Sequence, residues 1–200
     1  MTRPLVTVPI PTVPGREEYL RRAIASYEAQ GDVEIIVFRP SPTCGHAWHH
    51  GAQAARGRYI HFGADDVELA PGAFAHAIAA IQRNQHPAPL VLNPDGTVQS
   101  CGGSWASLEP DGTVTAFSRG PFIATDWWSI VAPIPSDLHY FTDNLVSARL
   151  EQRLGIPSVV CHGYRYVHHL AQPGRGAGMS ENERMDRDRA RYAEILQEAA

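Results

Sequence analysis

The sequence predicts an α/β protein built on a mostly parallel, doubly wound sheet. Through the first 85 residues, short β-rich apolar segments alternate with helical segments in the order strand, helix, strand, helix, strand, helix. Glycine or proline separates each segment from the next. With 200 residues the chain is long enough for one domain with a sizeable core, and no linker or repeat divides it.

The strands of the first half are predicted from apolar β-forming runs. Residues 5–10 alternate between core-facing and outward positions, whereas 33–38 and 59–62 are short, nearly continuous apolar runs typical of buried strands. The turn at 11–15 and the proline-containing loop at 39–45 follow the first two strands. These loops would lie at the carboxyl ends of the strands.

The helices of the first half are predicted at 16–30, 46–56 and 71–85, where apolar residues recur at helical spacing or alanine is abundant. Gly31 and Gly57 end the first two helices. Pro71 suits the first turn of the third, because the missing amide hydrogen is not needed there.

The second half of the sequence is less regular. Apolar and β-branched runs predict short strands, and two polar periodic runs predict helices, the second with a capping box formed by Ser180 and Glu183. In order, we expect strands at 90–92, 97–100 and 113–117, an apolar aromatic segment at 122–131, a helix at 143–154, strands at 158–161 and 164–167, a loop at 171–178 and a helix at 180–199.

Charge and cysteine content narrow the class of protein. The formal net charge of −4 disfavours nucleic acid as a partner, although a local basic patch remains compatible with it. The three cysteines, Cys44, Cys101 and Cys161, form neither a disulfide framework nor a zinc signature, which suits a reducing compartment. No run reaches membrane-spanning length and the N-terminus does not resemble a signal peptide, so we expect a cytoplasmic protein without a membrane partner.

Two adjacent carboxylates, Asp65 and Asp66, follow the third predicted strand after the small-residue turn Gly63-Ala64. Ligands bind at the carboxyl ends of strands in open α/β sheets. Carboxylates at such a place suit a hard divalent cation and, through it, phosphate oxygens. A plain turn is the alternative, since Asp and Gly also dominate turns for backbone reasons.

The order of motifs resembles family 2 glycosyltransferases, which have the GT-A fold. That family typically has an apolar strand ending in Ile-Pro-Thr, a helix with a late Ser, a Gly-Ala-Gly helix pattern before Tyr-Ile, and an Asp-X-Asp turn. The matching segments here are Val8-Pro-Ile-Pro-Thr12, Ile24-Ala-Ser26, His49-His-Gly-Ala-Gln-Ala-Ala-Arg-Gly-Arg-Tyr-Ile60 and Gly63-Ala-Asp-Asp66. The resemblance covers most of the chain and is strongest at 5–74.

This resemblance implies a single GT-A-like domain that transfers a sugar with inversion from a UDP- or GDP-sugar to an acceptor hydroxyl. Residues 1–89 would bind the nucleotide sugar, 90–179 would form the acceptor and catalytic half, and 180–200 would be a C-terminal helix. The acceptor and the oligomeric state stay undetermined. We expect donor contacts from Pro11, Thr12, Arg39, His49, Asp65, Gly102 and Gly103.

The resemblance also implies the reacting groups. Asp65 matches the metal-binding position of Asp-X-Asp, for Mn²⁺ or Mg²⁺, and a late histidine, His168 or His169, would complete the metal site. Asp143 matches the general base at the start of a late helix, with a helix N-cap as the alternative role. Trp127 and Trp128 are candidates to stack on the acceptor or to pack in the core.

The sequence departs from the family pattern at three places. Gly63 replaces the first Asp of Asp-X-Asp, the loop Arg39-Pro-Ser-Pro42 lacks the family's nucleotide-contacting Asp, and Thr142 replaces the acid that precedes the base. These departures leave the donor nucleotide and the strength of metal dependence open.

Three further hypotheses compete with this interpretation. A nucleotidyltransferase also uses a carboxylate-held metal, but the loop Pro11-Thr-Val-Pro-Gly-Arg16 has only one Gly and one Arg. A non-catalytic nucleotide-sugar or carbohydrate-binding module would tolerate the missing acids. Cys44 and His46, with His49 or His50, are spaced to share a helix face and bind zinc, but no fourth ligand is evident.

Arg175, in the loop at 171–178, could pair with a diphosphate.

Overall fold

The computed structural model describes residues 3–100, 119–169 and 181–198. Within these residues the strands form two four-stranded sheets, with the orders β2-β1-β3-β7 and β4-β8-β5-β6. The predicted α/β class is confirmed. The strands divide between two sheets instead of lying in one, because strand order depends on long-range pairing that local sequence patterns do not encode.

The first sheet holds the N-terminal strands. β1 (Val6–Pro11) pairs in parallel with β2 (Val33–Phe38) on one side and with β3 (Tyr59–His61) on the other. β7 (Phe122–Ala124) closes the edge by pairing antiparallel with β3. The carboxyl ends of three parallel neighbours therefore meet at one side of this sheet, where α/β proteins bind ligands.

The second sheet includes a strand that the sequence patterns did not predict. β4 (Val67–Leu69) pairs antiparallel with β8 (Ser158–His168), and β8 pairs in parallel with β5 (His86–Leu92), which carries β6 (Val98–Ser100) at its other edge. β4 directly follows the turn after β3 and is a strand because it pairs with β8, a contact between residues about 100 positions apart.

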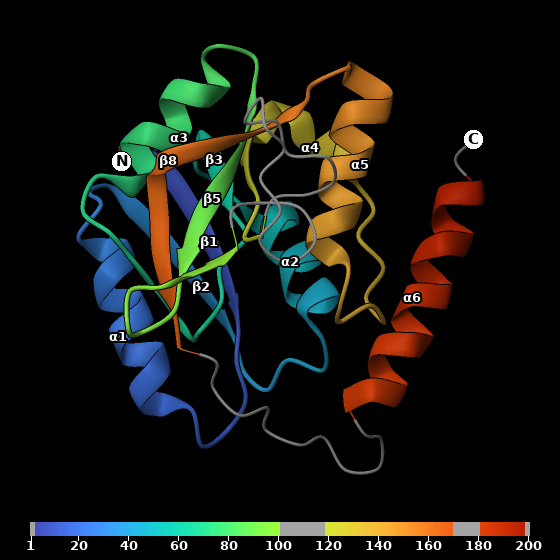
Figure 1. Ribbon diagram of the computed structural model, residues 1–200, viewed down its shortest axis with the longest axis horizontal. Helices are drawn as coiled ribbons and strands as arrows, with labels where there is room; N and C mark the ends of the chain where they lie inside the picture. Colours follow the sequence, from blue (N-terminus) through green and yellow to red (C-terminus); the bar gives the residue numbers. More distant parts are fainter. Residues whose placement is uncertain (1–2, 101–118, 170–180, 199–200) are drawn as a thin grey trace.

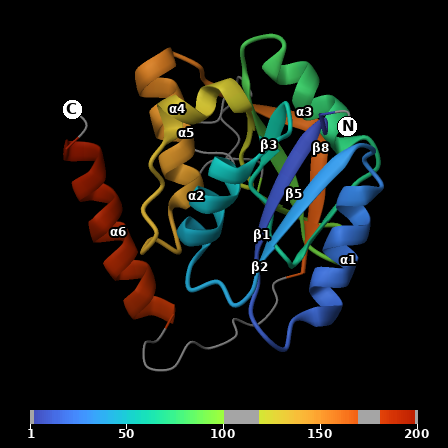
Figure 2. The ribbon, with the colours of Figure 1, turned by 180° about the vertical axis from the view of Figure 1, so that it is seen from behind.

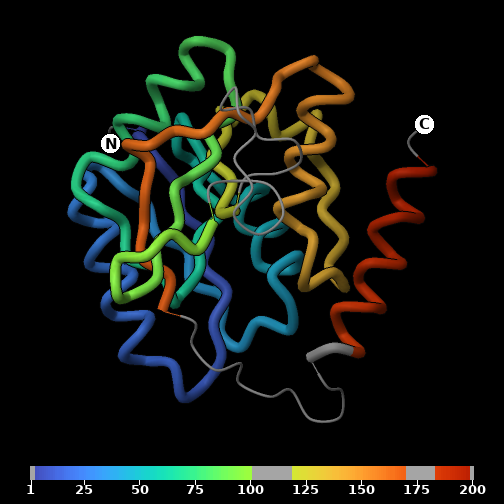
Figure 3. Tube along the Cα trace, in the orientation of Figure 1, coloured from blue at the N-terminus to red at the C-terminus, as the bar shows by residue number. Residues whose placement is uncertain are grey.

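The two strands expected at 158–161 and 164–167 are one bent strand, β8, as the tube in Figure 3 shows. The pairing register between β5 and β8 shifts after Pro89, opposite this bend. At the bend, a Cβ atom on Gly163 would lie 2.3 Å from the ring of His76, so glycine lets the strand approach helix α3 (Ala73–Ile81).

The helices lie on both sides of the sheets (Figures 1 and 2). They are α1 (Glu17–Glu28), α2 (Cys44–Ala54), α3 (Ala73–Ile81), the short α4 (Trp128–Val131) after a 3₁₀ turn (Thr125–Trp127), α5 (Thr142–Leu154) and α6 (Glu181–Glu198). In both views α6 is the outermost helix, beyond α5. No helix of the described part has both the length and the apolar character needed to cross a membrane.

Two buried clusters account for the hydrophobic patterns. One contains Val8 with residues of α1, α3 and β8, and the other contains Ile60 with residues of α2, α4 and α5. Along β3, Tyr59 belongs to the first cluster and Ile60 to the second, as the two-residue period of a strand requires.

Several predicted boundaries were wrong for local reasons. α2 begins at Cys44 instead of 46, because Thr43 caps it by accepting a hydrogen bond from the His46 N–H (3.0 Å). α3 ends at Ile81 instead of 85, since Asn84 adopts a left-handed backbone (φ 59°) and β5 starts at once. The predicted strand at 113–117 and the predicted loop at 171–178 lie outside the described residues.

Candidate functional site

The paired carboxylates Asp65 and Asp66 lie just beyond β3 and contact the loop that follows β1. Thr12 Oγ1 donates a hydrogen bond to Asp65 Oδ2 (2.6 Å). Arg16 Nη2 pairs with Asp65 Oδ1 (2.8 Å) and with Asp66 Oδ2 (2.7 Å). Because β1 and β3 are adjacent parallel strands, their carboxyl ends bring these groups together in an electrostatic cluster. This joins two predicted donor residues, Thr12 and Asp65, which are 53 positions apart.

The turn that carries this cluster is held from three sides. Trp48 Nε1 donates to the Gly63 carbonyl (2.9 Å), and the Gly63 N–H donates to the Pro9 carbonyl (3.1 Å). The Tyr27 hydroxyl both donates to the Ala64 carbonyl (2.9 Å) and accepts from the Ala64 N–H (3.1 Å). Buried side chains with fixed partners of this kind keep the two carboxylates in place.

Packing leaves no free space for a side chain at Gly63, which stands at the first position of the Asp-X-Asp pattern. A Cβ atom on Gly63 would lie 2.6 Å from Val8 Cγ1 and 3.2 Å from the Tyr27 hydroxyl. Val8 is fully buried in β1, so it has little room to move. An aspartate at position 63 would therefore require its neighbours to move, and the carboxylates of this turn come from Asp65 and Asp66.

Gly63→Ala is therefore expected to destabilise the protein by about 1–3 kcal/mol through overpacking, measured by urea unfolding. The double variant Val8→Ala/Gly63→Ala should lose less stability than the two single variants added together, because the smaller side chain makes room for the new methyl group. Additive losses would contradict this steric account.

The two candidate histidines point to different partners. His168 lies opposite Val67 in the antiparallel β4–β8 pair, and the His169 N–H donates to the Asp66 carbonyl (2.8 Å). His168 Nε2 is 3.6 Å from Asp66 Oδ2, whereas His169 Nε2 is 2.8 Å from Glu68 Oε1. His168 is therefore the histidine beside the acidic pair. Successive side chains of a strand face opposite sides, so both cannot reach it.

Burial and charge set the protonation of the two carboxylates in opposite directions. Burial raises the pKa of Asp65, and the hydrogen bond from Thr12 and the charge of Arg16 only partly offset this. Burial also acts to raise the pKa of Asp66, but His168 and then Arg16 outweigh it, so the pKa is lowered. Asp66 is thus the more strongly ionised member of the pair.

The donor set is compatible with a divalent cation that binds together with phosphate. Across residues 3–100, 119–169 and 181–198, no three His, Cys, Asp or Glu side chains are arranged to hold a metal ion by themselves. Mg²⁺ and similar ions in nucleotide enzymes usually take one or two protein ligands and complete their shell with phosphates and water. Asp66 and His168 offer a carboxylate and an imidazole for such a site, with Asp65 adjacent.

Asp143 lies in the first turn of α5. Phe141 is the N-cap residue of that helix and no side chain caps it, so the alternative role of Asp143 as the N-cap is not what the fold uses. The carboxylate accepts a hydrogen bond from the Asn144 N–H (3.0 Å). Burial raises the pKa of Asp143, although Arg119 opposes the rise.

The Cys44 thiol is influenced by the charges of both Asp143 and the acidic pair. Burial, followed by the charges of Asp66, Asp143 and Asp65, raises the pKa of this thiol to about 12. All three carboxylates therefore act on one half-buried thiol at the N-terminus of α2. Coulombic interactions weaken with distance, so the predicted base and the acidic pair both lie near Cys44.

Of the remaining residues predicted to contact the donor, only Pro11 lies next to a residue of the acidic cluster along the chain. Pro11 ends β1 beside Thr12, and Arg39 pairs with Glu17 after β2. His49 lies further along α2, where its Nδ1 accepts from the Ile134 N–H (3.3 Å). Gly102 and Gly103 lie outside the described residues.

The tryptophans and the cysteine–histidine segment contribute mainly to packing. Trp128 lies between His49 (ring centroids 5.6 Å apart) and Phe62 (6.4 Å), and Trp127 is half-buried against both apolar clusters. The core alternative for the tryptophans thus has direct support. In the described part of the chain, Cys44 and the histidines of α2 form no metal-binding group of three.

Arg16 has no role predicted from the sequence, where it stands out only as the single basic residue of its loop. Asp66 is predicted there only together with Asp65, as the second carboxylate of a pair. The buried Nε of Arg16 has no hydrogen-bond partner within the described residues, which suits a site that receives an anion. The available signal is an arginine in the loop after the first predicted strand, together with the acidic pair after the third.

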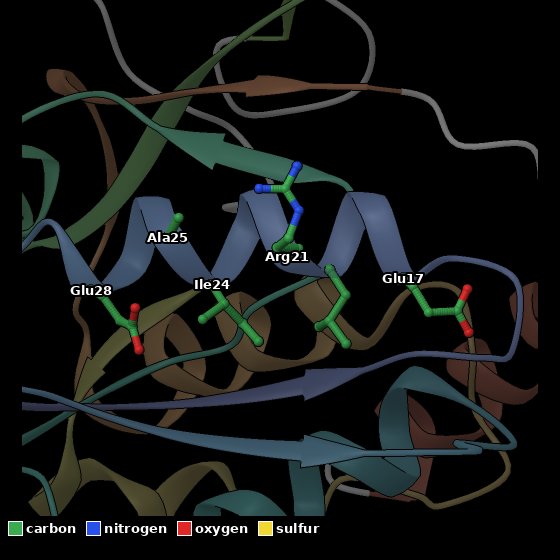
Figure 4. Close-up of a pocket in the computed structure, with 6 residues that line it drawn as sticks. Glu17, Arg21, Ile24, Ala25 and Glu28 are labelled. Carbon is green, nitrogen blue, oxygen red and sulfur yellow. The ribbon is translucent and has the colours of Figure 1, made fainter.

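A separate hollow of about 370 Å³ runs along α1 and is lined by Leu20 and Ile24 with charged neighbours (Figure 4). Its lining residues all come from one helix, and none of them belongs to the acidic cluster. We therefore place the candidate site at the strand ends and not in this hollow.

Comparisons with solved structures support the fold. GalNAc-T7 with UDP, GalNAc and Mn²⁺ superposes with a TM-score of 0.61 at 15% identity, covering 96% of this chain and 48% of the other. S. aureus TarS gives 0.55 at 14% identity, covering 83% and 37%, and its 1–349 fragment gives 0.53 at 15%, covering 82% and 60%. Both proteins are glycosyltransferases with a GT-A-like fold.

The chain thus has a GT-A-like fold and spans only 37–60% of the length of these three structures. No family model and no curated protein matches the sequence.

Proposed function

We propose that this protein is a metal-dependent inverting glycosyltransferase that moves a sugar from a nucleotide sugar to an acceptor hydroxyl. The observation that supports this most is the cluster of Asp65, Asp66, Arg16 and His168 at the strand ends of a GT-A-like fold. It combines acidic groups for a cation with a basic group for phosphate.

On the donor side, Asp66 and His168 would hold a divalent cation, Mn²⁺ or Mg²⁺, with Asp65 beside them as the position predicted from the sequence. When bound, this cation neutralises negative charge that develops on the leaving diphosphate. Arg16 supplies a second positive charge at the same place and has an unused buried N–H for a phosphate oxygen. Thr12 keeps Asp65 oriented through its short hydrogen bond.

On the acceptor side, Asp143 acts as the general base. The acceptor oxygen forms a bond to the anomeric carbon, the bond from that carbon to the diphosphate oxygen breaks, and the hydroxyl proton passes to the Asp143 carboxylate. A carboxylate whose pKa is raised by burial is a stronger base than an exposed one. Attack opposite to the leaving group inverts the anomeric centre, which is the outcome that the family resemblance implies.

A uridine nucleotide is the first donor class to test, because GalNAc-T7, which has a similar fold, was solved with UDP. The loop after β2 gives no strong argument for one base over another, since its Arg39 is engaged with Glu17. GDP-sugars therefore belong in the same panel, and a soluble acceptor hydroxyl completes the reaction.

The test is thermal stability with UDP, GDP and their sugars, each with and without Mn²⁺ or Mg²⁺. A ligand that binds the native state raises the melting temperature, by an amount equivalent to about 2.7 kcal/mol at 100 times its Kd. We expect a rise that needs both nucleotide and metal, and slow release of free nucleoside diphosphate from the matching donor in the absence of acceptor.

Two other results would favour a different function. Binding without any release or transfer would favour a non-catalytic binding module. Release of pyrophosphate from a nucleoside triphosphate and a sugar phosphate would instead identify a nucleotidyltransferase. No thermal shift with any donor, or a shift with Zn²⁺ alone, would remove the support for a nucleotide-sugar site at Asp65 and Asp66.

A further inference from the structure

Helix α6 carries a buried charge that the proposed reaction does not use. Asp188 is only 1% exposed, although α6 lies at the outside of the molecule beyond α5 (Figure 1). Asp and Glu are almost never buried this completely unless they are paired. The partners of Asp188 should therefore indicate what the residue is for.

Those partners are backbone groups of the segment that leads into α5. Asp188 Oδ2 accepts hydrogen bonds from the His139 N–H (2.8 Å) and the Tyr140 N–H (2.9 Å). Its other oxygen is held by Arg187, whose Nη2 also donates to the Asp137 carbonyl (3.2 Å). One carboxylate thus fixes two consecutive backbone amides of a segment 48 positions earlier in the chain.

The residue after these amides is also held by α6. Phe141 has a left-handed backbone (φ 63°), which a non-glycine residue keeps only when its surroundings impose it. Its ring stacks on Tyr192, with centroids 5.6 Å apart and planes at 16°, and Arg189 lies over it at 5.9 Å. Phe141 is the N-cap residue of α5. The start of α5 is therefore set by contacts with α6.

A small apolar cluster joins the same two parts. Leu138 and Leu145 are fully buried against Ile195 of α6, with Tyr192 and Leu196 packed on them. Helix α6 thus contacts residues 138–145 through hydrogen bonds to a carboxylate, through ring stacking and through apolar packing. Asp143 lies inside this segment, and after burial its charge is the next cause that raises the pKa of Tyr192.

We propose that Asp188 is a positioning residue for the transfer reaction: by holding the His139 and Tyr140 amides, it fixes the turn at Phe141 and thereby the place of Asp143 relative to the Asp65–Asp66 pair. This inference rests on the proposed function, in which Asp143 is the general base. Asp188 touches neither donor nor acceptor in this scheme and acts only through the backbone. A shift of about 1 Å in a catalytic group is enough to lower a rate about 100-fold.

The experiment compares Asp188→Ala, Asp188→Asn and the exposed control Glu194→Gln in the full chain. Alanine removes the acceptor oxygen, whereas asparagine keeps one oxygen for the two amides. We expect Asp188→Ala to lower kcat by about 10–100-fold, Asp188→Asn to restore most of it, and Glu194→Gln to stay within about twofold of the wild type. The Kd for UDP with Mn²⁺ should stay within about twofold in all three, because the donor side is not touched.

The pH profile of kcat separates positioning from a general loss of structure. The charged and titratable groups that act on or respond to Asp143 come from several elements: Arg119, Cys44 of α2, Tyr166 of β8 and Tyr192 of α6. Loosening the turn would admit water to Asp143 and lower its raised pKa, so the acid limb of the profile should move to lower pH in Asp188→Ala. A variant that only reduces the folded fraction would leave this limb in place.

Amide hydrogen exchange at His139 and Tyr140 tests whether Asp188 holds these two amides, and this measurement does not require an activity assay. Asp188→Ala should accelerate exchange at both amides and leave β1 protected. Should Asp188→Ala fail to fold, Tyr192→Ala with Tyr192→Phe as its conservative partner replaces it, with the same expected kcat loss and recovery.

Unchanged kcat in a folded Asp188→Ala, or a lower kcat with an equal loss in Asp188→Asn and an unmoved acid limb, would overturn the proposal. Faster amide exchange in Asp188→Ala, together with a wild-type protein that binds no donor, would instead show that the proposed function is wrong and that Asp188 is purely structural.

Discussion

Replacing Asp143 with asparagine is expected to lower the transfer rate by about 10²–10⁴-fold, the usual contribution of a general base. Asparagine has the same size and can still accept the hydrogen bond from the Asn144 N–H, so the turn of α5 should survive. Binding of nucleotide and metal should stay close to that of the wild type, because Asp143 faces the acceptor in the proposed scheme. The measurement is kcat and donor Kd for the two proteins.

The same variant should be more stable than the wild type at neutral pH. Burial raises the pKa of Asp143 in the folded state, so its stabilising contribution is present at low pH and is lost as the pH rises through that pKa. At pH 7 the wild type buries an ionised carboxylate that asparagine lacks. We expect a higher Tm for Asp143→Asn at pH 7 and a smaller difference at pH 4. A lower Tm at pH 7 would count against the buried base, as would retained activity.

Replacing Asp66 with asparagine is expected to remove the metal-dependent part of donor binding. Loss of an outer-shell partner of a metal lowers metal affinity by about 10–100-fold, and loss of a direct ligand should lower it at least as much. His168→Ala should produce a similar loss, since its imidazole is beside the same oxygen. Asp126→Asn, at an exposed position, serves as the matched control. Titration of Mn²⁺ in the presence of UDP measures the effect.

Asp66→Asn should also be less stable than the wild type at neutral pH, opposite to the result for Asp143. The pKa of Asp66 is lowered in the folded state, so its contribution is present at neutral pH and is lost as the pH falls through that pKa. The deficit in Tm should therefore shrink on acidification.

The companion variant Asp65→Asn tests which of the two carboxylates would hold the proposed metal. The motif resemblance in the sequence favours Asp65, whereas the contact with His168 favours Asp66. A larger loss of Mn²⁺ affinity in Asp65→Asn than in Asp66→Asn would return the assignment to Asp65.

Much of the candidate site was predictable because its parts are encoded locally. Asp65 and Asp66 follow directly after a strand, and the end of β1 at Pro11 and Thr12 is marked by its own motif. In a parallel sheet the pairing of neighbouring strands brings such segments together without further information. The contact of Thr12 with Asp65 is the result.

Other parts of the site depend on contacts that no local pattern encodes. Gly63 reads as a departure from a motif, and only the position of Val8 shows that a side chain would not fit there. His168 and His169 are equivalent in sequence, and the antiparallel register of β4 with β8 decides that His168 faces Asp66. The short strand β4 was not predicted, because it becomes a strand through its pairing with β8, about 100 positions later in the chain.

By itself, the sequence determined the α/β class, the alternation of the first half, and the candidate carboxylates Asp65 and Asp143, since each is marked by local periodicity or by an ordered set of motifs. Only the tertiary structure decided the division into two sheets, the roles of Arg16 and His168 around the acidic pair, and the hold of Asp188 on the start of α5. The physical reason is that strand pairing, steric exclusion and buried hydrogen bonds join residues about 50 to 100 positions apart, whereas sequence patterns report on neighbours within a few turns.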